Sequence, residues 1–245
     1  MTKDEALKAY KCELNEKLDG SVLTNALELV TYLAANDIYP DPNMFNAFRY
    51  AGEMIFFIGL GKSLSIYSGN YDLNYDDEAV QKDDALEMFV HKATNRCVQH
   101  KGCLESPGLR RVAFGTVYEN RCRSTFCFKL PPLKNLALIK KVAEMRKNAI
   151  DAMPELKRAL RSDINEMLNY YMKSCAVDFA DYLYENYELQ HAGDKVWRVQ
   201  KNEKILCMIL LEKDKWTITL YNGDKFETPK FDEYDKIKKL LEVSV

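Results

Sequence analysis

The sequence lacks the features that most directly assign a chain to a class. No apolar run approaches the roughly 20 residues of a membrane-spanning helix, so we expect no membrane span. It contains no G-x-G-x-x-G loop, Walker phosphate loop, H-E-x-x-H motif or G-x-S-x-G motif. The segment from Met1 to Glu5 is acidic and polar where a signal peptide would be basic and then apolar. These absences favour a cytoplasmic protein and give no support to a particular enzyme class.

What is present is the composition of a globular protein. The chain has 245 residues, of which 47% are hydrophobic and 29% are charged, with 35 Lys and Arg against 37 Asp and Glu. That length and composition suit one large domain or two modest ones, each with its own core, and exclude a disordered or disulfide-dense chain.

Hydrophobic spacing predicts an α+β fold made of helices and antiparallel meanders. Thr2 and Glu5 form a capping-box pattern at the start of a helix that Gly20 ends. Pro154 can begin a helix but not continue one, so the long helical stretch from Leu133 to Glu188 should break near Ala152. The other expected elements are a helix over 21–36, strands over 45–50, 54–60, 63–68, 196–200, 205–211 and 216–221, and a closing helix over 231–243.

The two halves share motifs in the same order, which indicates an internal repeat. Residues 32–36 match 182–186 at an offset of 150, Glu53 and Ile55 match Glu203 and Ile205 at that offset, and 67–70 match 221–224 at 154. The predicted organisation is an N-terminal module over 1–150 with an insertion at about 90–130, a linking helix over 151–178 and a smaller module over 179–245. The alternative is that helix–meander units resemble one another without a shared origin.

The insertion holds the one pattern that suggests a metal. Cys97, His100 and Cys103 lie three residues apart and Cys122 follows on an expected strand, giving three thiolates and an imidazole. Zn²⁺ favours such tetrahedral sets, and a closed set of four protein ligands would be structural, with zinc as the cofactor. Cys127 is the alternative fourth ligand, although its apolar neighbours favour packing.

Two other interpretations of the cysteines remain open. The thiols could be unrelated, or one of them could serve a thiol enzyme or redox sensor, for example Cys127 or Cys103 paired with His91. The odd total of seven argues against a disulfide framework. Cys12, Cys175 and Cys207 lie in apolar or helical patterns and are expected to pack as small core residues.

The same segment resembles one found in uncharacterised bacterial proteins. The matching residues run from Cys97 to Cys103, then Pro107 to Arg110, then Phe114 to Cys122, before a helix over 139–150. In those proteins the pattern is approximately C-x2-C-x2-C, P-G-x-R and F-G-x-x-F-x-N-x-C, so His100 and Tyr118 replace Cys and Phe here. The resemblance covers about 60 residues, implies the ligand set Cys97, His100, Cys103 and Cys122, and implies no known activity.

Charge is distributed unevenly along the chain. Residues 96–161 contain 15 Lys and Arg against 5 Asp and Glu, while the rest contains 20 against 32. We therefore expect a non-enzymatic binding protein that receives a small anionic ligand or an acidic protein surface. A nucleic-acid regulator using 96–161 is the alternative, and acidic surfaces of the same chain could instead neutralise the segment. The candidate anion-binding residues are Arg96, Arg110, Arg111, Arg121 and Arg123.

Overall fold

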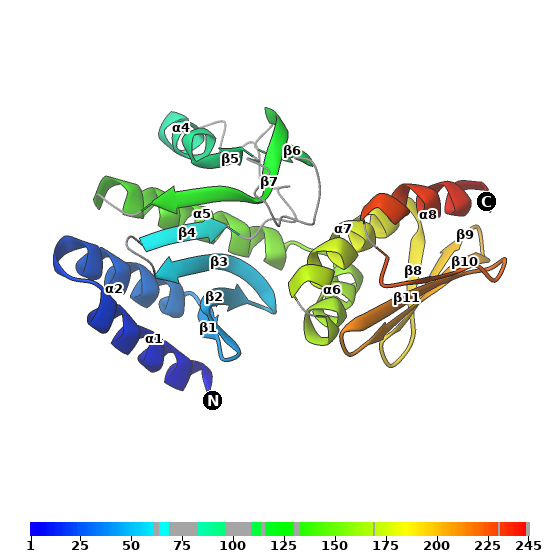
Figure 1. Ribbon diagram of the computed structural model, residues 1–245, viewed down its shortest axis with the longest axis horizontal. Helices are drawn as coiled ribbons and strands as arrows, with labels where there is room; N and C mark the ends of the chain where they lie inside the picture. Colours follow the sequence, from blue (N-terminus) through cyan, green and yellow to red (C-terminus); the bar gives the residue numbers. More distant parts are fainter. Residues whose placement is uncertain are drawn as a thin grey trace. The chain divides into compact units, whose positions relative to one another are not determined.

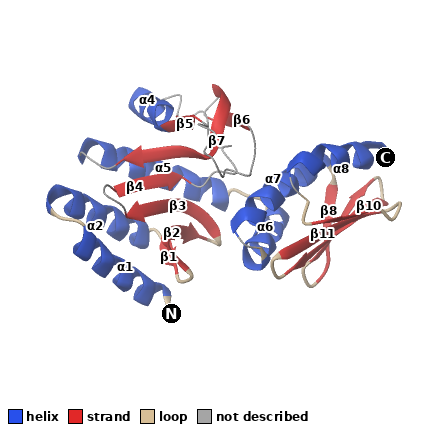
Figure 2. Ribbon diagram, viewed as in Figure 1, coloured by secondary structure: helices blue, strands red, loops and turns tan. Residues whose placement is uncertain are grey.

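The computed structural model describes residues 1–60, 64–68, 83–96, 109–113, 116–129, 133–168, 170–229 and 231–243. The chain divides into two compact units, Met1–Ala152 and Met153–Val245. Both contain helices and antiparallel strands (Figures 1 and 2), which confirms the predicted α+β class.

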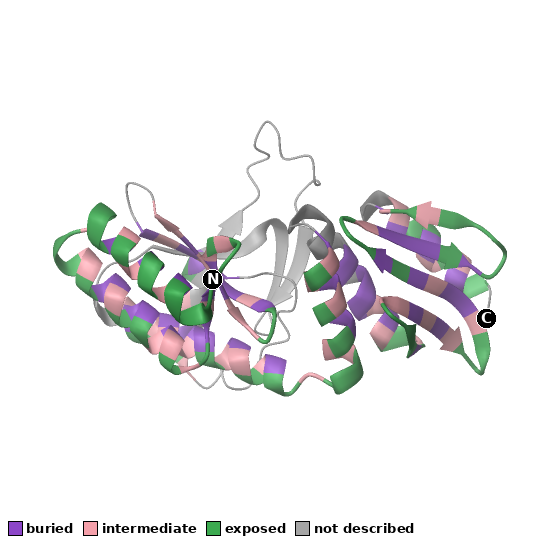
Figure 3. Ribbon diagram, turned by 90° about the horizontal axis from the view of Figure 1, so that it is seen from below, coloured by how far each residue is buried: buried purple, intermediate pink, exposed green. Residues whose placement is uncertain are grey.

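The first unit begins with two helices, α1 (Lys3–Lys17) and α2 (Gly20–Ala35). The predicted capping box is present, because Thr2 Oγ1 accepts from the Glu5 amide at 3.2 Å and the Glu5 carboxylate accepts from the Thr2 amide at 2.7 Å. Buried and exposed positions alternate along both helices with the period of an amphipathic helix (Figure 3).

The helices are followed by a meander of short strands, β1 (Tyr39–Asp41), β2 (Met44–Tyr50), β3 (Glu53–Leu60) and β4 (Leu64–Ser68). The turn between β2 and β3 places Ala51 at φ 47° and Gly52 at φ 83°, and two consecutive positive φ values are typical of a type I′ hairpin. The segment that follows α2 is rich in turn-forming residues, and three of them, Tyr39–Asp41, pair with β2 as a short strand.

The sheet continues through strands from later in the chain. They are β5 (Thr94–Arg96), β6 (Leu109–Ala113) and β7 (Thr116–Lys129), in the order β1-β2-β3-β4-β7-β5 with β6 also paired to β7. Helix α4 (Asp84–Ala93) precedes β5, and α5 (Leu133–Asp151) follows β7.

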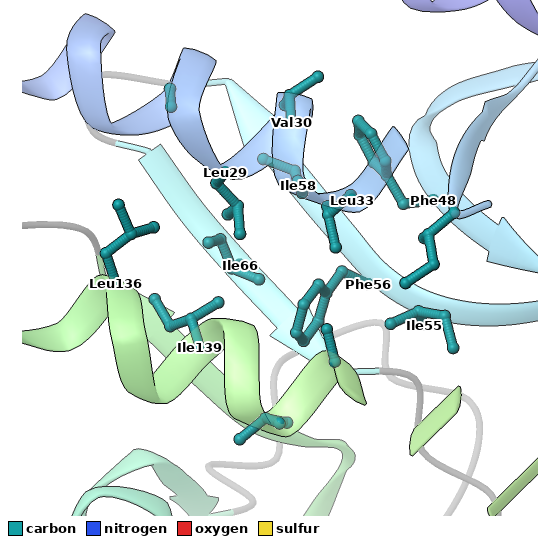
Figure 4. Close-up of a cluster of buried hydrophobic side chains, with 14 of the residues drawn as sticks. Leu29, Val30, Leu33, Phe48, Ile55, Phe56, Ile58, Ile66, Leu136 and Ile139 are labelled. Carbon is teal, nitrogen blue, oxygen red and sulfur yellow. The ribbon is translucent and has the colours of Figure 1, made fainter. Parts of the chain in front are cut away.

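The core of this unit lies between its helices and one face of the sheet (Figure 4). Leu33 of α2, Phe56 and Ile58 of β3, Ile66 of β4 and Ile139 of α5 are each at most 1% exposed. The α4 residue Leu86 belongs to the same cluster. Tyr10 of α1 reaches the sheet and donates its hydroxyl hydrogen to the Ile58 carbonyl at 3.3 Å.

The second unit also opens with two helices, α6 (Glu155–Met167) and α7 (Tyr170–Asn186). The break near Ala152 is confirmed, with Pro154 as the residue that caps α6. The helical stretch predicted after Pro154 is interrupted at Leu168, which has an extended backbone with φ −103° and ψ 147°. Arg161 and Asp181 form a buried ion pair between the two helices at 3.1 Å.

A five-stranded sheet and a final helix complete the second unit. The strands are β8 (Glu188–Gly193), β9 (Val196–Lys201), β10 (Lys204–Glu212), β11 (Lys215–Leu220) and β12 (Lys225–Glu227), paired in the order β12-β11-β10-β9-β8. The closing helix, α8 (Phe231–Val243), has the predicted bounds. The buried Trp197, Trp216, Phe179 and Tyr234 belong to this unit.

Two further expectations are tested by burial and helix length. Cys207 is 1% exposed, as expected for a core cysteine, whereas Cys12 is exposed, so that prediction was wrong. Across the described ranges, none of the helices combines the length and apolar character that a membrane crossing requires.

Candidate functional site

The backbone register brings arginine-bearing positions of three strands together on β7. Arg96 of β5 lies directly opposite Arg121, and Leu109 of β6 is also in register with Arg121. Because one residue cannot pair with two strands on the same edge, β5 and β6 lie on opposite edges of β7 at this point. Arg110 and Arg111 therefore belong to the strand on one side of Arg121, and Arg96 to the strand on the other. We call β5, β6 and β7 the arginine strands.

Like charges at such positions have an electrostatic consequence. Residues directly opposite in an antiparallel pair have Cβ atoms about 4.5–5.5 Å apart, and a like-charged pair there destabilises the sheet. Arg96 and Arg121 are partners in the backbone register, and the ladder is irregular between Thr94 and Arg96. Guanidinium groups bind carboxylate and phosphate oxygens in forked geometry, so arginine positions that the backbone register pairs are candidates for anion binding.

The structure describes one of the four predicted metal ligands, Cys122. Cys97, His100 and Cys103 lie outside the described residues. Cys122 lies on β7 directly after Arg121, and Cys127 lies in register with Tyr67 of β4. Among the residues that are described, no group of three or more His, Cys, Asp or Glu is arranged to hold a metal ion.

The face of the first sheet opposite its core carries an aromatic pair. Phe57 of β3 lies in register with Tyr67 of β4, and their ring centroids are 6.3 Å apart. Neither residue belongs to the core cluster, and both are partly exposed. Tyr67 is in turn in register with Cys127, so the pair and the arginine strands belong to one continuous sheet. Strand alternation could have shown that Phe57 and Phe56 point to opposite faces.

The second unit contains a charged cluster that the sequence pattern did not indicate. Asp163 of α6 accepts from Lys195 Nζ at 2.8 Å and from the indole nitrogen of Trp197 at 2.9 Å. Lys195 also contacts Glu166 Oε2 at 2.6 Å, and His191 Nε2 lies 3.8 Å from Asp163. These hydrogen bonds, first to Asp163 and then to Glu166, raise the pKa of Lys195. Each of these contacts joins a residue of α6 to a residue of the β8–β9 hairpin, so the cluster holds the hairpin against the helix and is best explained as structural.

Comparison with known proteins adds no family to this picture. No protein-family model, no curated protein and no solved structure matches the chain.

Proposed function

We propose that this is a non-enzymatic binding protein whose arginine strands receive an anionic ligand, with an acidic protein surface as the partner these strands suit best. The observation that carries the proposal is the register of Arg96 opposite Arg121. Arginines at paired backbone positions bring two permanent positive charges to one part of the sheet, and charge-assisted hydrogen bonds to an anion would offset their mutual repulsion. Arg110, Arg111 and Arg123 lie on the same strands and would extend the field that attracts it.

The proposal includes a structural zinc ion held by Cys97, His100, Cys103 and Cys122. It is supported by where the described strands end. The strand β5 ends at Arg96, one residue before Cys97, and Arg96 is in register with Arg121, one residue before Cys122. Two of the proposed ligands are therefore adjacent in sequence to residues that the backbone pairs. Zinc bound here would fasten the chain after β5 to β7.

A second candidate partner is single-stranded nucleic acid, and one observation favours it. Aromatic rings on a sheet face can stack on bases, and Phe57 and Tyr67 form such a pair in the sheet that the arginine strands extend. A nucleic acid would use both the rings and the arginines, whereas an acidic protein surface would use the arginines alone.

A binding titration of the whole chain tests the proposal. The probes are a fluorescent oligoglutamate peptide and a fluorescent single-stranded oligothymidine, each measured by anisotropy at two salt concentrations. Arg96→Gln or Arg121→Gln should weaken peptide binding by roughly tenfold to a hundredfold, the loss expected for a charge-assisted contact. Arg198→Gln is the matched control, because Arg198 lies on a strand of the second unit with Gln190 and Met208 opposite it.

The outcomes separate the candidates. Peptide binding that depends on Arg96 and Arg121 but not on Arg198 supports the acidic partner. Binding of the oligonucleotide alone, weakened by Phe57→Ala, would replace that partner with nucleic acid. No binding of either probe at low salt would refute the proposed function.

A further inference from the structure

We infer that the arginine strands are an insertion into the first of two copies of one module, and that the second copy preserves the module without a binding site. The location of binding in this inference rests on the proposed function, whereas the insertion itself rests on geometry alone.

The opening helix pairs agree in their ends. Leu18 and Leu168, 150 residues apart, both end their helices in extended backbone, with amides bonded to the carbonyls of Leu14 and Ile164. The second helices end alike as well. Asn36 donates its side-chain amide hydrogen to the Tyr32 carbonyl at 2.9 Å, and Asn186 donates to Tyr182 at 2.8 Å.

The meanders agree in a turn and in a bulge. The β2–β3 turn has positive φ at Ala51 and Gly52, and the β9–β10 turn has positive φ at Asn202 and Glu203, 151 residues later. The pairing of β3 with β2 skips Ile55, and the pairing of β10 with β9 skips Leu206, also 151 residues later. A bulge at the same place in two sheets is a specific feature, because it displaces the ladder by one residue.

The strand registers also correct one detail of the sequence comparison. Ile55 corresponds to Leu206, whereas the sequence match paired it with Ile205. A shift of one residue exchanges the two faces of a strand, so only the structural correspondence keeps both residues at the bulge.

The final helices agree once a second offset is applied. Lys140 of α5 lies 5.2 Å from the ring centre of Tyr32, and Lys238 of α8 lies 4.3 Å from that of Tyr182. The two lysines are 98 residues apart, and the buried Ile139 and Ile237 beside them share that spacing. The number of residues between equivalent positions of the two copies is therefore about 151 up to β4 and 98 from α5 onward.

The last strand of each copy locates the change. Phe128 of β7 is in register with Ile66 of β4, and Phe226 of β12 is in register with Ile218 of β11. Phe128 and Phe226 are again 98 residues apart, so the end of β7 corresponds to β12. The link between these strands is residues 69–125 in the first copy and the turn 221–223 in the second. Helix α4, β5, β6 and the first part of β7 lie within the longer link.

Native-state hydrogen exchange on the intact chain tests the insertion. We expect amides of α4, β5, β6 and residues 116–124 to lose protection at lower urea than those of β2, β3 and β4, because an inserted unit can open without the module. Simultaneous loss of protection in both groups would overturn the inference.

A replacement variant tests where binding resides. In the full chain, residues 69–125 are replaced by the Tyr-Asn-Gly of 221–223. The variant should unfold cooperatively, at a lower midpoint because Leu86 leaves the core, and should not bind oligoglutamate. Retained binding or an unfolded variant would overturn the inference. If the unaltered chain itself fails to bind the peptide, the proposed function fails, and the exchange experiment still decides the insertion.

Discussion

Removing the carboxylate of Asp163 should destabilise the second unit by several times more than removing that of its neighbour Glu166. Both side chains bind Lys195, but they differ in exposure: the Asp163 side chain is 16% exposed and that of Glu166 is 64% exposed. Asp163 also accepts the indole hydrogen of Trp197, a residue that is 0% exposed. The two residues lie on the same helix, and alanine improves helix propensity more at Asp163 than at Glu166, so propensity works against the expected difference.

The expected magnitudes follow from burial. Asp163→Ala leaves the Trp197 indole donor buried without its acceptor, which costs about 1–3 kcal/mol, and removes a charge-assisted bond to Lys195 worth about 1.5–3 kcal/mol. Part of the second loss is recovered because Lys195 keeps Glu166. The sum is therefore about 2–4 kcal/mol. Glu166→Ala breaks an exposed pair and should cost about 0–1 kcal/mol.

Urea unfolding followed by tryptophan fluorescence measures both variants. Asp163→Asn should cost less than Asp163→Ala, since the amide oxygen can still accept from the indole. In a double-mutant cycle, Trp197→Phe should reduce the cost of Asp163→Ala, because the orphaned donor is then absent. Equal losses for Asp163→Ala and Glu166→Ala, or a loss below about 1 kcal/mol for the former, would refute this reasoning.

Three further predictions concern titration, thiol reactivity and metal content. Lys141 holds the pKa of Asp83 below its usual range, so their contact stabilises the fold at pH values above the ordinary aspartate pKa. This stabilisation is lost as the pH falls through the pKa of Asp83 in the folded protein. NMR titration of Lys141→Met should show a raised Asp83 pKa, and an unchanged pKa would count against the prediction. Burial raises the pKa of the Cys207 thiol to about 12, so iodoacetamide should modify the exposed Cys12 in the native protein and Cys207 only after unfolding; mass spectrometry showing equal rates would contradict it. Native mass spectrometry should find one zinc per chain, lost in Cys97→Ser and kept in Cys12→Ser, whereas a metal-free parent would exclude the site.

Helices and strands could be predicted from the sequence where their buried residues recur at a regular spacing. The bounds of α8 follow from the spacing of Tyr234, Ile237 and Leu241, all of which the structure buries. Strand β8 was missed because it lies at a sheet edge, where Gln190 and His191 are exposed and no apolar alternation results. The interruption at Leu168 was missed because apolar residues recur at helical spacing on both sides of it, at Leu160, Ile164 and Tyr171, although the backbone changes direction between α6 and α7.

In the candidate site, too, some features could be predicted from the sequence and others depend on tertiary structure. The arginines could be chosen from the sequence because charge density is visible there, and their number contrasts with an acidic remainder. Which arginine positions are paired depends on strand register, and the register between β5 and β7 is fixed by residues far apart in the chain. The Asp163 cluster could not be foreseen for the same reason, since its helix and hairpin are joined by tertiary contact rather than by a local pattern.

The most direct test of the anion site is the unfolding free energy of Arg96→Gln, measured without any multivalent anion and compared with the parent chain. If Arg96 and Arg121 repel across the ladder, neutralising one should raise the unfolding free energy by up to about 1 kcal/mol while weakening oligoglutamate binding. Arg198→Gln, which removes a hydrogen bond to Gln190, should neither raise the unfolding free energy nor weaken oligoglutamate binding. A lower unfolding free energy for Arg96→Gln, with peptide affinity unchanged, would mean that Arg96 supports the sheet, and would contradict the anion site.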